Sequence, residues 1–576
     1  MLTLHLGIAS ANSVTQSTSL STFSPSTGGS SFLMARIYTH GFWMAATLVF
    51  AFAEGARQSA ATSPLVSAPA GKFSGYRMTS SQGRDFWAFS GIRYAKAPIG
   101  NLRFKAPVPA APLRDKQDAV TEGPKCSQLN TKDFKSTEGS EDCLFLNVYT
   151  HDVKRRAAVM LWIHGGGYES GSGSKTEYGP ELLMNEDIVL VTINYRLSVL
   201  GFASLGNKLI PGNFGLKDQE EAIRWTKKNI RRFGGDPDNI TIFGESAGAG
   251  SVSLLLRGRA ARNVKRGIAM SGSALCPWTI ARKTREATLD VAKALECDTE
   301  SDEKTLECLS SKPAQKIILA RLRVNITNEE LTPFVPVVER GGPVPADPWE
   351  NPPSDRALMI SHTTAEGNFF LSPLLGAGPL LQEGLYNAIR KNFDKLIPKA
   401  LYFEFTAKNP TAVSEAIRKY YLSDGIDAKN NASLQQAVSD GLFNYPVYKD
   451  VVRSRGPVYF YVFDYLGAQQ INISGQGPAH AQDLPFIFRR PTQADVSKGT
   501  DEDRQKSEQM VKMFADFAKG QDPTPANAEG SDWGKKSANG GGYLLVSRGN
   551  PKIYGPTWEK ERIEFWSKLP FRPDNN

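Results

Sequence analysis

The pentapeptide Gly244-Glu-Ser-Ala-Gly248 decides how this sequence is interpreted, because its G-x-S-x-G spacing is typical of a sharp turn between a strand and a helix. The β-branched and aromatic residues Ile240–Phe243 predict a strand before it. The residues Ala249–Leu256 are compatible with a helix after it. Glycine is needed on both sides because side chains there would collide where strand and helix pass closely. The context predicts that Ser246 projects its hydroxyl as a nucleophile.

Several apolar runs elsewhere in the chain are too continuous for strands that expose one face. Strands of a parallel sheet that are buried on both faces have this composition. The runs are Ala158–Ile163, Ile188–Ile193, Ile240–Phe243, Arg356–Ile360 and Val458–Phe463. Helical patterns lie between several of them, such as Asp218–Arg231, which ends at two glycines and the turn Asp-Pro-Asp-Asn. This alternation predicts an α/β fold with a mainly parallel sheet covered on both faces.

Three further segments complete the expected architecture. The stretches 72–77 and 84–94 predict an antiparallel β entry to the sheet, and 502–519 predicts a late surface helix with an apolar stripe. The Pro-rich stretch 343–353 predicts a loop long enough to cap a pocket. No Pro, Gly or Ser linker interrupts the chain after residue 60, so we expect one catalytic domain over residues 58–576.

The first 57 residues predict a targeting segment. No Asp, Glu, Lys or Arg precedes Arg36, and Met34 opens a short basic stretch that leads to the apolar run Phe42–Ala53 and then to small residues. This order is typical of a secretory signal peptide, and the run is too short to cross a bilayer of ~30 Å. We expect residues 1–57 to be an N-terminal extension and signal peptide, with the true start at Met34 and a secreted, extracellular product.

Charge and composition exclude several classes of partner. The 68 Lys and Arg residues against 59 Asp and Glu give a net charge of +9. The basic stretches 227–232 and 257–265 lack interleaved aromatics and recognition motifs, so we interpret them as solvated surface and expect no nucleic-acid partner. The sequence has no apolar run of 18 or more residues, so no transmembrane segment is predicted. No His/Cys cluster predicts a metal site, and no cofactor is expected.

Five cysteines indicate disulfide bonds. Secretion favours disulfides, and an odd number leaves one cysteine unpaired. Closeness in the sequence suggests the pairs Cys126–Cys143 and Cys297–Cys308, which leaves Cys276, whereas buried reduced thiols are the alternative. Each short closed loop would contribute roughly 3 kcal/mol to stability.

A serine nucleophile needs a base, and the chain has only six histidines. Two lie in or before the signal, one lies in a polar turn and one belongs to a glycine motif. His480 lies in a glycine-rich loop after the strand expected at Val458–Phe463 and fits the chain order nucleophile, acid, histidine. His362 is the alternative base.

An acid should follow a strand end between Ser246 and His480, where it can hold the imidazole in the required tautomer. Glu366 lies in the loop that leaves the expected strand Arg356–Ile360, whereas Asp355 precedes that strand. Glu366 is therefore the candidate acid, and an exposed loop glutamate is the alternative interpretation.

The motif His164-Gly-Gly-Gly167 follows a buried run. Three glycines after a strand allow backbone N–H groups to converge on a developing oxyanion, together with the N–H of Ala247 after the nucleophile. A flexible glycine loop is the alternative.

Three stretches carry a resemblance to a known family, and they are Gly91–Phe104, Glu141–Tyr149 and Phe233–Gly248. With them the chain, from about Leu65 to Trp566, resembles the type-B carboxylesterase and cholinesterase family. The resemblance implies the α/β-hydrolase fold, with a large, mostly parallel central sheet, helices on both faces and a small N-terminal antiparallel β element.

The resemblance also implies roles for single residues. Ser246, Glu366 and His480 would form a Ser-His-Glu triad, and Gly166, Gly167 and Ala247 would match the oxyanion donors. The disulfides would be Cys126–Cys143 and Cys297–Cys308, and Cys276 would be a free buried thiol.

Departures from the family pattern narrow the expected substrate. Cholinesterases place a Trp in the loop closed by the first disulfide, where its face attracts choline, but Ser127–Asp142 is short and contains none. Cysteines for a third cholinesterase disulfide are missing, and Glu245 stands where juvenile hormone esterases typically carry Gln. We expect a general carboxylesterase that hydrolyses small to medium apolar esters through an acyl-enzyme. The alternatives are a lipase or steryl ester hydrolase, and a non-catalytic neuroligin-like binding protein.

The sequons at Asn239, Asn325, Asn431 and Asn472 predict a glycoprotein, with glycans where the asparagine is exposed. Asn239 adjoins a buried strand and is expected to be unmodified.

Overall fold

The computed structural model describes residues 63–324, 332–351, 355–375, 379–472, 476–490, 495–531, 533–534, 542–555 and 558–571. The expected signal peptide with Met34 lies outside these residues, and so does the sequon at Asn325.

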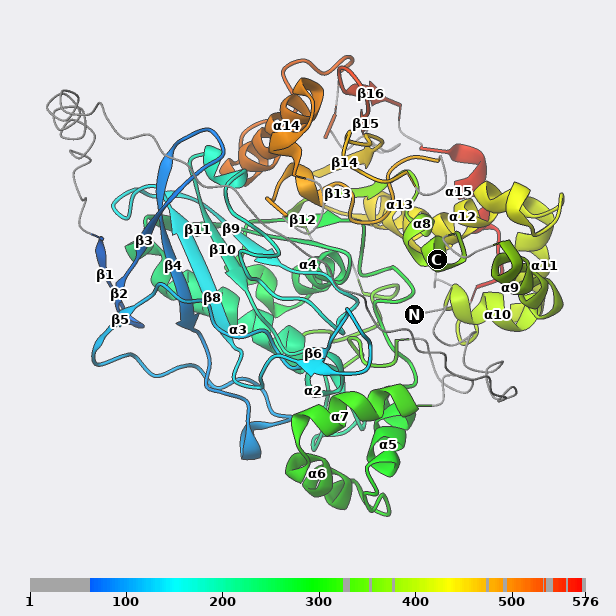
Figure 1. The fold of residues 1–576 in the computed structure, drawn as a ribbon, viewed down its shortest axis with the longest axis horizontal. Helices are drawn as coiled ribbons and strands as arrows, with labels where there is room; N and C mark the ends of the chain where they lie inside the picture. Colours follow the sequence, from blue (N-terminus) through cyan, green and yellow to red (C-terminus); the bar gives the residue numbers. More distant parts are fainter. Residues whose placement is uncertain are drawn as a thin grey trace, which may run out of the picture. The chain divides into compact units, whose positions relative to one another are not determined.

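Eleven strands of the described residues form one mixed sheet (Figure 1). They are β3 (Tyr76–Thr79), β4 (Asp85–Arg93), β8 (Phe145–Thr150), β9 (Ala157–Ile163), β10 (Ile188–Ile193), β11 (Gly235–Glu245), β12 (Arg266–Met270), β13 (Ala357–Thr363), β14 (Val458–Phe463), β15 (Tyr543–Val546) and β16 (Lys552–Tyr554). Their order is β16-β15-β14-β13-β12-β11-β9-β10-β8-β4-β3. The neighbours from β15 to β10 pair in parallel, and the pairs at both edges are antiparallel. The predicted α/β class is confirmed.

Two smaller β elements lie beside this sheet. β1 (Leu65–Ala68), β2 (Gly71–Ser74) and β5 (Lys116–Asp118) form a three-stranded sheet, in which β1 and β2 pair antiparallel, as expected for the small N-terminal element, whereas β2 and β5 pair in parallel. β6 (Gln128–Leu129) and β7 (Thr137–Glu138) form a hairpin inside the loop closed by the first disulfide.

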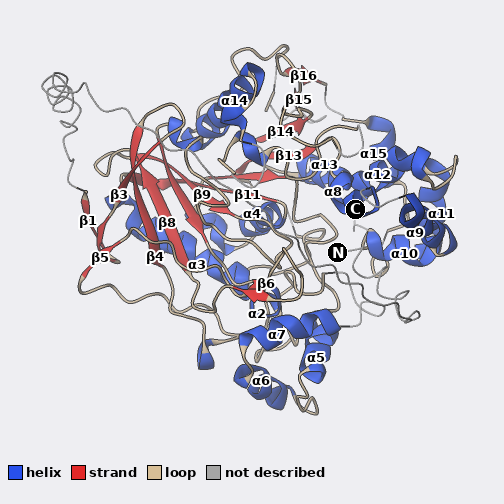
Figure 2. Cartoon of the chain, in the orientation of Figure 1, coloured by secondary structure: helices blue, strands red, loops and turns tan. Residues whose placement is uncertain are grey.

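Helices cover both faces of the large sheet (Figure 2). They are α2 (Ser198–Phe202), α3 (Phe214–Asn229), α4 (Ala247–Arg257), α5 (Thr284–Ala294), α6 (Asp302–Ser311), α7 (Ala314–Ala320), α8 (Gly367–Leu375), α9 (Pro379–Lys391), α10 (Phe393–Ala400), α11 (Pro410–Tyr421), α12 (Asn431–Ser439), α13 (Tyr445–Arg453), α14 (Asp501–Lys519) and α15 (Lys560–Ser567). The described residues from Pro64 onward belong to one compact unit. The single catalytic domain expected over residues 58–576 stays a prediction.

Alternation along β9 explains why the core has two halves. Successive side chains of a strand point to opposite faces of the sheet. Val159 and Leu161 pack into the core cluster that contains α3 and α4, whereas Met160 and Trp162 pack into the cluster that contains α14. The continuous apolar run predicted this burial on both faces.

The structure differs from the sequence prediction at several strand boundaries, and β13 runs to Thr363, three residues past the expected end at Ile360. The Asp-Pro-Asp-Asn turn belongs to β11, because Gly235 already pairs with Ala157 and the ladder resumes at Ile240 after an irregularity. The strand expected over 72–77 is divided into β2 and β3 at Gly75, where a Cβ atom would lie 2.7 Å from the Ala88 carbonyl oxygen. The two halves join different sheets.

The interpretation of 257–265 as solvated surface is wrong at its first residue. Arg257 has a side chain that is only 4% exposed, and it forms an ion pair with the fully buried Asp450. A buried carboxylate needs such a partner, since an unpaired buried charge is costly. Among the described residues, no helix has the length and apolar character needed to cross a membrane.

Candidate active site

Ser246 occupies the turn between β11 and α4. Its backbone angles are φ 57° and ψ −122°, a conformation that non-glycine residues rarely adopt. The turn is held by hydrogen bonds from the Ser246 amide to the Met270 carbonyl and from the Gly250 amide to the Ser246 carbonyl, both 2.9 Å. Strained residues persist where the surrounding structure determines them, and such residues cluster at functional sites.

The glycines of the pentapeptide are required by the end of the neighbouring strand β9. A Cβ atom on Gly248 would lie 2.0 Å from the Ile163 carbonyl oxygen, and one on Gly244 would lie 2.6 Å from the same atom. No real side chain tolerates these distances. The collision expected from the sequence therefore involves strand β9 as well as helix α4.

His480 and Glu366 are brought together by two loops that follow parallel strands. Glu366 follows β13, and His480 follows β14. The Glu366 Oε2 atom lies 2.6 Å from His480 Nδ1, and its Oε1 atom accepts a hydrogen bond of 2.7 Å from the Thr363 amide. Burial by itself would raise the pKa of Glu366, but His480 and these hydrogen bonds lower it below its usual range.

The other nitrogen of His480 faces a second carboxylate. Nε2 lies 3.1 Å from Oε1 of Glu245, the residue before the candidate nucleophile. Burial alone would lower the pKa of His480, but the charges of Glu245 and Glu366 raise it to about 9. Among the described residues, Ser246 Oγ makes no hydrogen bond in this state.

Asp483 adds a third carboxyl group beside the imidazole. It is fully buried, and neither of its oxygens has a hydrogen-bond partner among the described residues. Burial and the charges of Glu245 and Glu366 raise the pKa of Asp483 to about 8. Burial also raises the pKa of Glu245, whereas His480 and Arg490 lower it. These groups make His480 the centre of a carboxyl cluster.

Backbone N–H groups are available beside the turn. Gly166 and Gly167 have φ values of 100° and 63°, and within the described chain neither of their amides, nor that of Ala247, is paired with an acceptor. The carbonyl oxygen of Gly166 accepts from the amides of Glu169 (3.0 Å) and Ser170 (3.1 Å), which closes the turn. Unpaired donors next to a nucleophile can stabilise an oxyanion.

Aromatic rings form the surroundings of His480. The ring centroid of Phe443 lies 4.8 Å from that of His480, and those of Phe369 and Phe370 lie at 5.6 and 6.2 Å. Phe443 belongs to a π-helical turn, Asp440–Asn444, that joins α12 to α13. Such turns occur often at functional sites.

The remaining candidate residues lie apart from this centre. His362, the alternative base, is fully buried, with its ring 4.3 Å from Trp558, and burial lowers its pKa to about 4. The disulfides join Cys126 to Cys143 and Cys297 to Cys308, and Cys276 is free and buried. In the described part of the chain, no three His, Cys, Asp or Glu residues are grouped as metal ligands would be.

Sequence reasoning did not assign a role to Glu245 and Asp483. Both lie inside motifs that were recognised for other residues, since Glu245 precedes Ser246 and Asp483 follows His480 by three positions. Their spacing therefore contained a signal, but their common electrostatic effect on the imidazole depends on the folded loops.

A strained serine turn beside unpaired backbone amides is the arrangement of serine hydrolases with the α/β-hydrolase fold. Residues 62–566 match the model of the Carboxylesterase family. The chain therefore belongs to the carboxylesterase family and is a carboxylic ester hydrolase.

Three relatives illustrate this membership. Esterase FE4 of Myzus persicae is 35% identical over 82% of this chain and 87% of its own length. A carboxylic ester hydrolase of Bombus ignitus is 32% identical over 88% of this chain and 94% of its own. A juvenile hormone esterase of Tribolium castaneum is 35% identical over 80% of this chain and 84% of its own.

The pH profile of ester hydrolysis should depend on Glu245. Because the pKa of His480 is raised to about 9, the neutral imidazole is lost as the pH falls through that value, above the ordinary pKa of 6.5. Glu245→Gln removes one of the charges that hold the proton, so the acid limb of kcat/KM should move to lower pH. We expect a shift of about one unit, which corresponds to about 1.4 kcal/mol.

Asp483→Asn is the matched control for this measurement. The charge of Asp483 also raises the pKa of His480, but less than the charge of Glu245 does, so replacing Asp483 with its isosteric amide should move the acid limb by less. If the acid limb does not move in Glu245→Gln, or moves equally in Asp483→Asn, Glu245 is not the carboxylate that mainly raises the pKa of His480.

Proposed function

We propose that this chain hydrolyses carboxylic esters through Ser246 as nucleophile, His480 as general base and Glu366 as the group that orients His480. The observation that carries the proposal is the 2.6 Å contact between Glu366 Oε2 and His480 Nδ1. This contact fixes the tautomer that leaves Nε2 to exchange a proton. Nε2 in turn lies beside the residue that precedes the strained serine.

The first half of the reaction follows from these positions. When His480 is neutral with its proton on Nδ1, Nε2 carries no hydrogen to donate to the Glu245 carboxylate, and its lone pair is free to accept the Ser246 proton. Ser246 Oγ then attacks the ester carbonyl carbon, and the amides of Gly166, Gly167 and Ala247 stabilise the oxyanion. His480 returns the proton to the departing alcohol, which leaves an acyl-enzyme.

The second half releases the acid. Water gives a proton to His480 Nε2 and attacks the acyl carbon, and the tetrahedral intermediate collapses with return of the proton to Ser246 Oγ. The charge of Glu366 stabilises the imidazolium that forms in each half.

The environment of His480 supports small to medium apolar esters as substrates. Phe369, Phe370 and Phe443 present rings within 6.2 Å of the imidazole ring. Apolar walls of this kind favour acyl and alcohol groups that lose little hydration on binding. The loop of the first disulfide, with Cys126 at one end, contains no Trp to face a choline cation.

The disulfides support secretion, because disulfides persist in oxidising compartments. Asn472 is exposed, and we propose it as a glycan site. The side-chain oxygen of Asn239 accepts from Arg266, and that of Asn431 accepts from Tyr386.

Organophosphate labelling tests the nucleophile. A labelled peptide containing Ser246 is expected by mass spectrometry, and Ser246→Ala should abolish labelling and lower kcat on p-nitrophenyl butyrate by on the order of 10⁶-fold. Ser251→Ala is the control, because Ser251 lies fully buried on α4 and should leave labelling intact. Full labelling of the Ser246→Ala protein would refute the proposal.

Two esters that differ only in charge test the substrate class. We expect kcat/KM for 3,3-dimethylbutyl acetate to equal or exceed that for acetylcholine, since the two alcohol groups have the same shape and only one carries a cation. A preference for acetylcholine of tenfold or more would contradict an apolar specificity. Faster hydrolysis of a triglyceride emulsion than of any monomeric ester would favour the lipase alternative.

N-terminal sequencing of the secreted protein tests the targeting segment. We expect a mature terminus a few residues after the apolar run Phe42–Ala53. A mature start before Met34 would contradict the expected signal peptide.

A further inference from the structure

The segment Gly171–Gly173, which follows the turn of Gly166 and Gly167, is held almost entirely by side chains. We call it the return segment. The Gly173 amide donates to Asn194 Oδ1 (2.8 Å), and the Gly173 carbonyl oxygen accepts from Thr192 Oγ1 (2.6 Å). Buried backbone groups outside helices and sheets need such partners. The position of the return segment therefore depends on the side chains that surround it.

Gln128 binds the first residue of the return segment in both directions. The Gly171 amide donates to Gln128 Oε1 (2.8 Å), and Gln128 Nε2 donates to the Gly171 carbonyl oxygen (3.0 Å). Nε2 also donates to the Cys126 carbonyl oxygen (2.9 Å). Gln128 is only 1% exposed, so these bonds are shielded from water. The side-chain amide of Gln128 thus pairs with the backbone of Gly171 in the way that the backbone of a neighbouring strand would.

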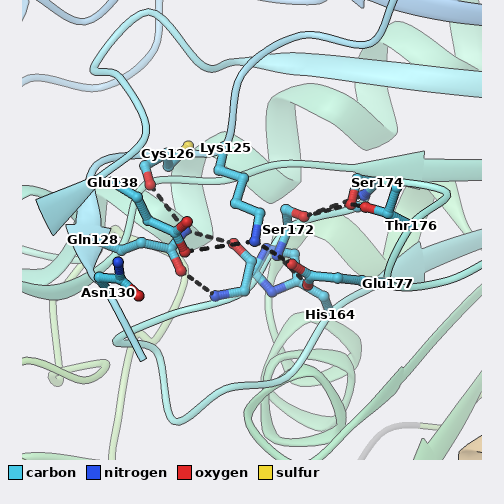
Figure 3. Close-up of polar contacts among 12 residues, drawn as sticks. Lys125, Cys126, Gln128, Asn130, Glu138, His164, Ser172, Ser174, Thr176 and Glu177 are labelled. Carbon is cyan, nitrogen blue, oxygen red and sulfur yellow. Dashed lines mark hydrogen bonds and ion pairs between the residues drawn. The ribbon is translucent and has the colours of Figure 1, made fainter. Parts of the chain in front are cut away.

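A charged pair holds the second residue of the return segment. The Ser172 amide donates to Glu177 Oε2 (3.2 Å), and Glu177 Oε1 lies 2.5 Å from Lys125 Nζ. Figure 3 shows Lys125 reaching toward Glu177, with Gln128 on the other side of Cys126. The amide of Gly171 is thus held by Gln128, and the amide of Ser172 is held by Glu177, which pairs with Lys125.

The return segment lies directly against His164 and Gly165, which precede the candidate oxyanion donors, and Ser170 just before it lies against Gly166. A Cβ atom on Gly171 would lie 2.5 Å from His164 Nδ1, and one on Gly166 would lie 2.2 Å from the Ser170 carbonyl oxygen. Atoms at such close approach cannot move independently, because packed interiors have little free space. A displacement of Gly171 is therefore passed to the Gly166 turn.

We propose that Gln128 is a positioning residue that holds the amides of Gly166 and Gly167 where the oxyanion forms. Its own position is set by the Cys126–Cys143 disulfide two residues away and by its place in β6. The loop closed by the Cys126–Cys143 disulfide, which contains no Trp to face a choline cation, thereby supports the oxyanion donors. This inference rests on the proposed function of Ser246.

Gln128→Leu tests the proposal, because leucine has a similar size and removes all three hydrogen bonds. We expect kcat on p-nitrophenyl butyrate to fall at least about tenfold, but by less than the ~10²–10³ that follows removal of an oxyanion donor. KM should change less than about threefold, because an oxyanion contact is made mainly in the transition state. Affinity for a trifluoromethyl ketone, which forms a tetrahedral adduct with the serine, should fall in parallel with kcat/KM.

Asn130→Ala is the matched control within the same loop. Asn130 stabilises the hairpin by bonding Ser136 Oγ (3.2 Å) and the Lys132 amide (3.0 Å), without touching the return segment. We expect its kcat to stay within twofold of the unmodified protein. An equal loss in Asn130→Ala would show a general effect of the loop and overturn the proposal.

Two further results would overturn it. One is a folded Gln128→Leu protein with kcat within twofold, and the other is a rise in KM at constant kcat. If Gln128→Leu does not fold, Gln128→Glu replaces it, because a carboxylate still accepts the Gly171 amide but repels the Gly171 carbonyl oxygen. Ser246→Ala distinguishes a failure of this inference from a failure of the proposed function, because its loss of activity is expected whether or not Gln128 positions the oxyanion donors.

Discussion

The approach of the Ile163 carbonyl oxygen to Gly248 is the constraint on which the site depends. At this point the end of β9 and the start of α4 leave no room for a single carbon atom. The chain must therefore leave β11 through a tight turn in which Ser246 adopts a strained backbone conformation. The glycine motif begins where β9 ends, beside this turn. The positions of the candidate nucleophile and the candidate oxyanion donors are linked, because both depend on the same contact between the end of β9 and the start of α4. The large core on both faces holds these strands in place.

Around this rigid centre, the imidazole is controlled by charge. Glu366 and Glu245 face opposite nitrogens of His480, and Asp483 lies buried near both. Such an arrangement keeps a proton on the imidazole, which opposes its use as a base. In the proposed reaction, the same carboxylates would stabilise the imidazolium in the transition state, where the proton has just been taken from Ser246. The carboxyl cluster therefore lowers the fraction of His480 that is neutral in the resting protein, but it would stabilise the protonated imidazole in the transition state.

The fold was predictable from the sequence wherever the signal was local. The apolar runs at β10 and β14 have the same limits as the strands, and the run at β9 begins one residue late, because strands buried on both faces have few exposed positions to blur their ends. Ser246 was singled out by five adjacent residues and His480 by chain order. Glu245, Asp483 and Gln128 could not be assigned in this way, because their partners lie on other loops. The irregular start of β11 was misjudged for a related reason, since the pairing of Gly235 with Ala157 overrides a local turn pattern.

The carboxyl cluster also has a thermodynamic consequence for the whole fold. In the unfolded chain Asp483 would lose its proton near its ordinary pKa of 3.8, whereas in the folded protein it keeps it to about pH 8. His480 likewise keeps its proton to about pH 9 instead of 6.5. In both windows the native state binds more protons than the unfolded state, so the free energy of unfolding falls as the pH rises. Rising pH therefore deprotonates the proposed base and weakens the fold together, so in the proposed mechanism the upper end of the useful pH range is set by stability as much as by chemistry.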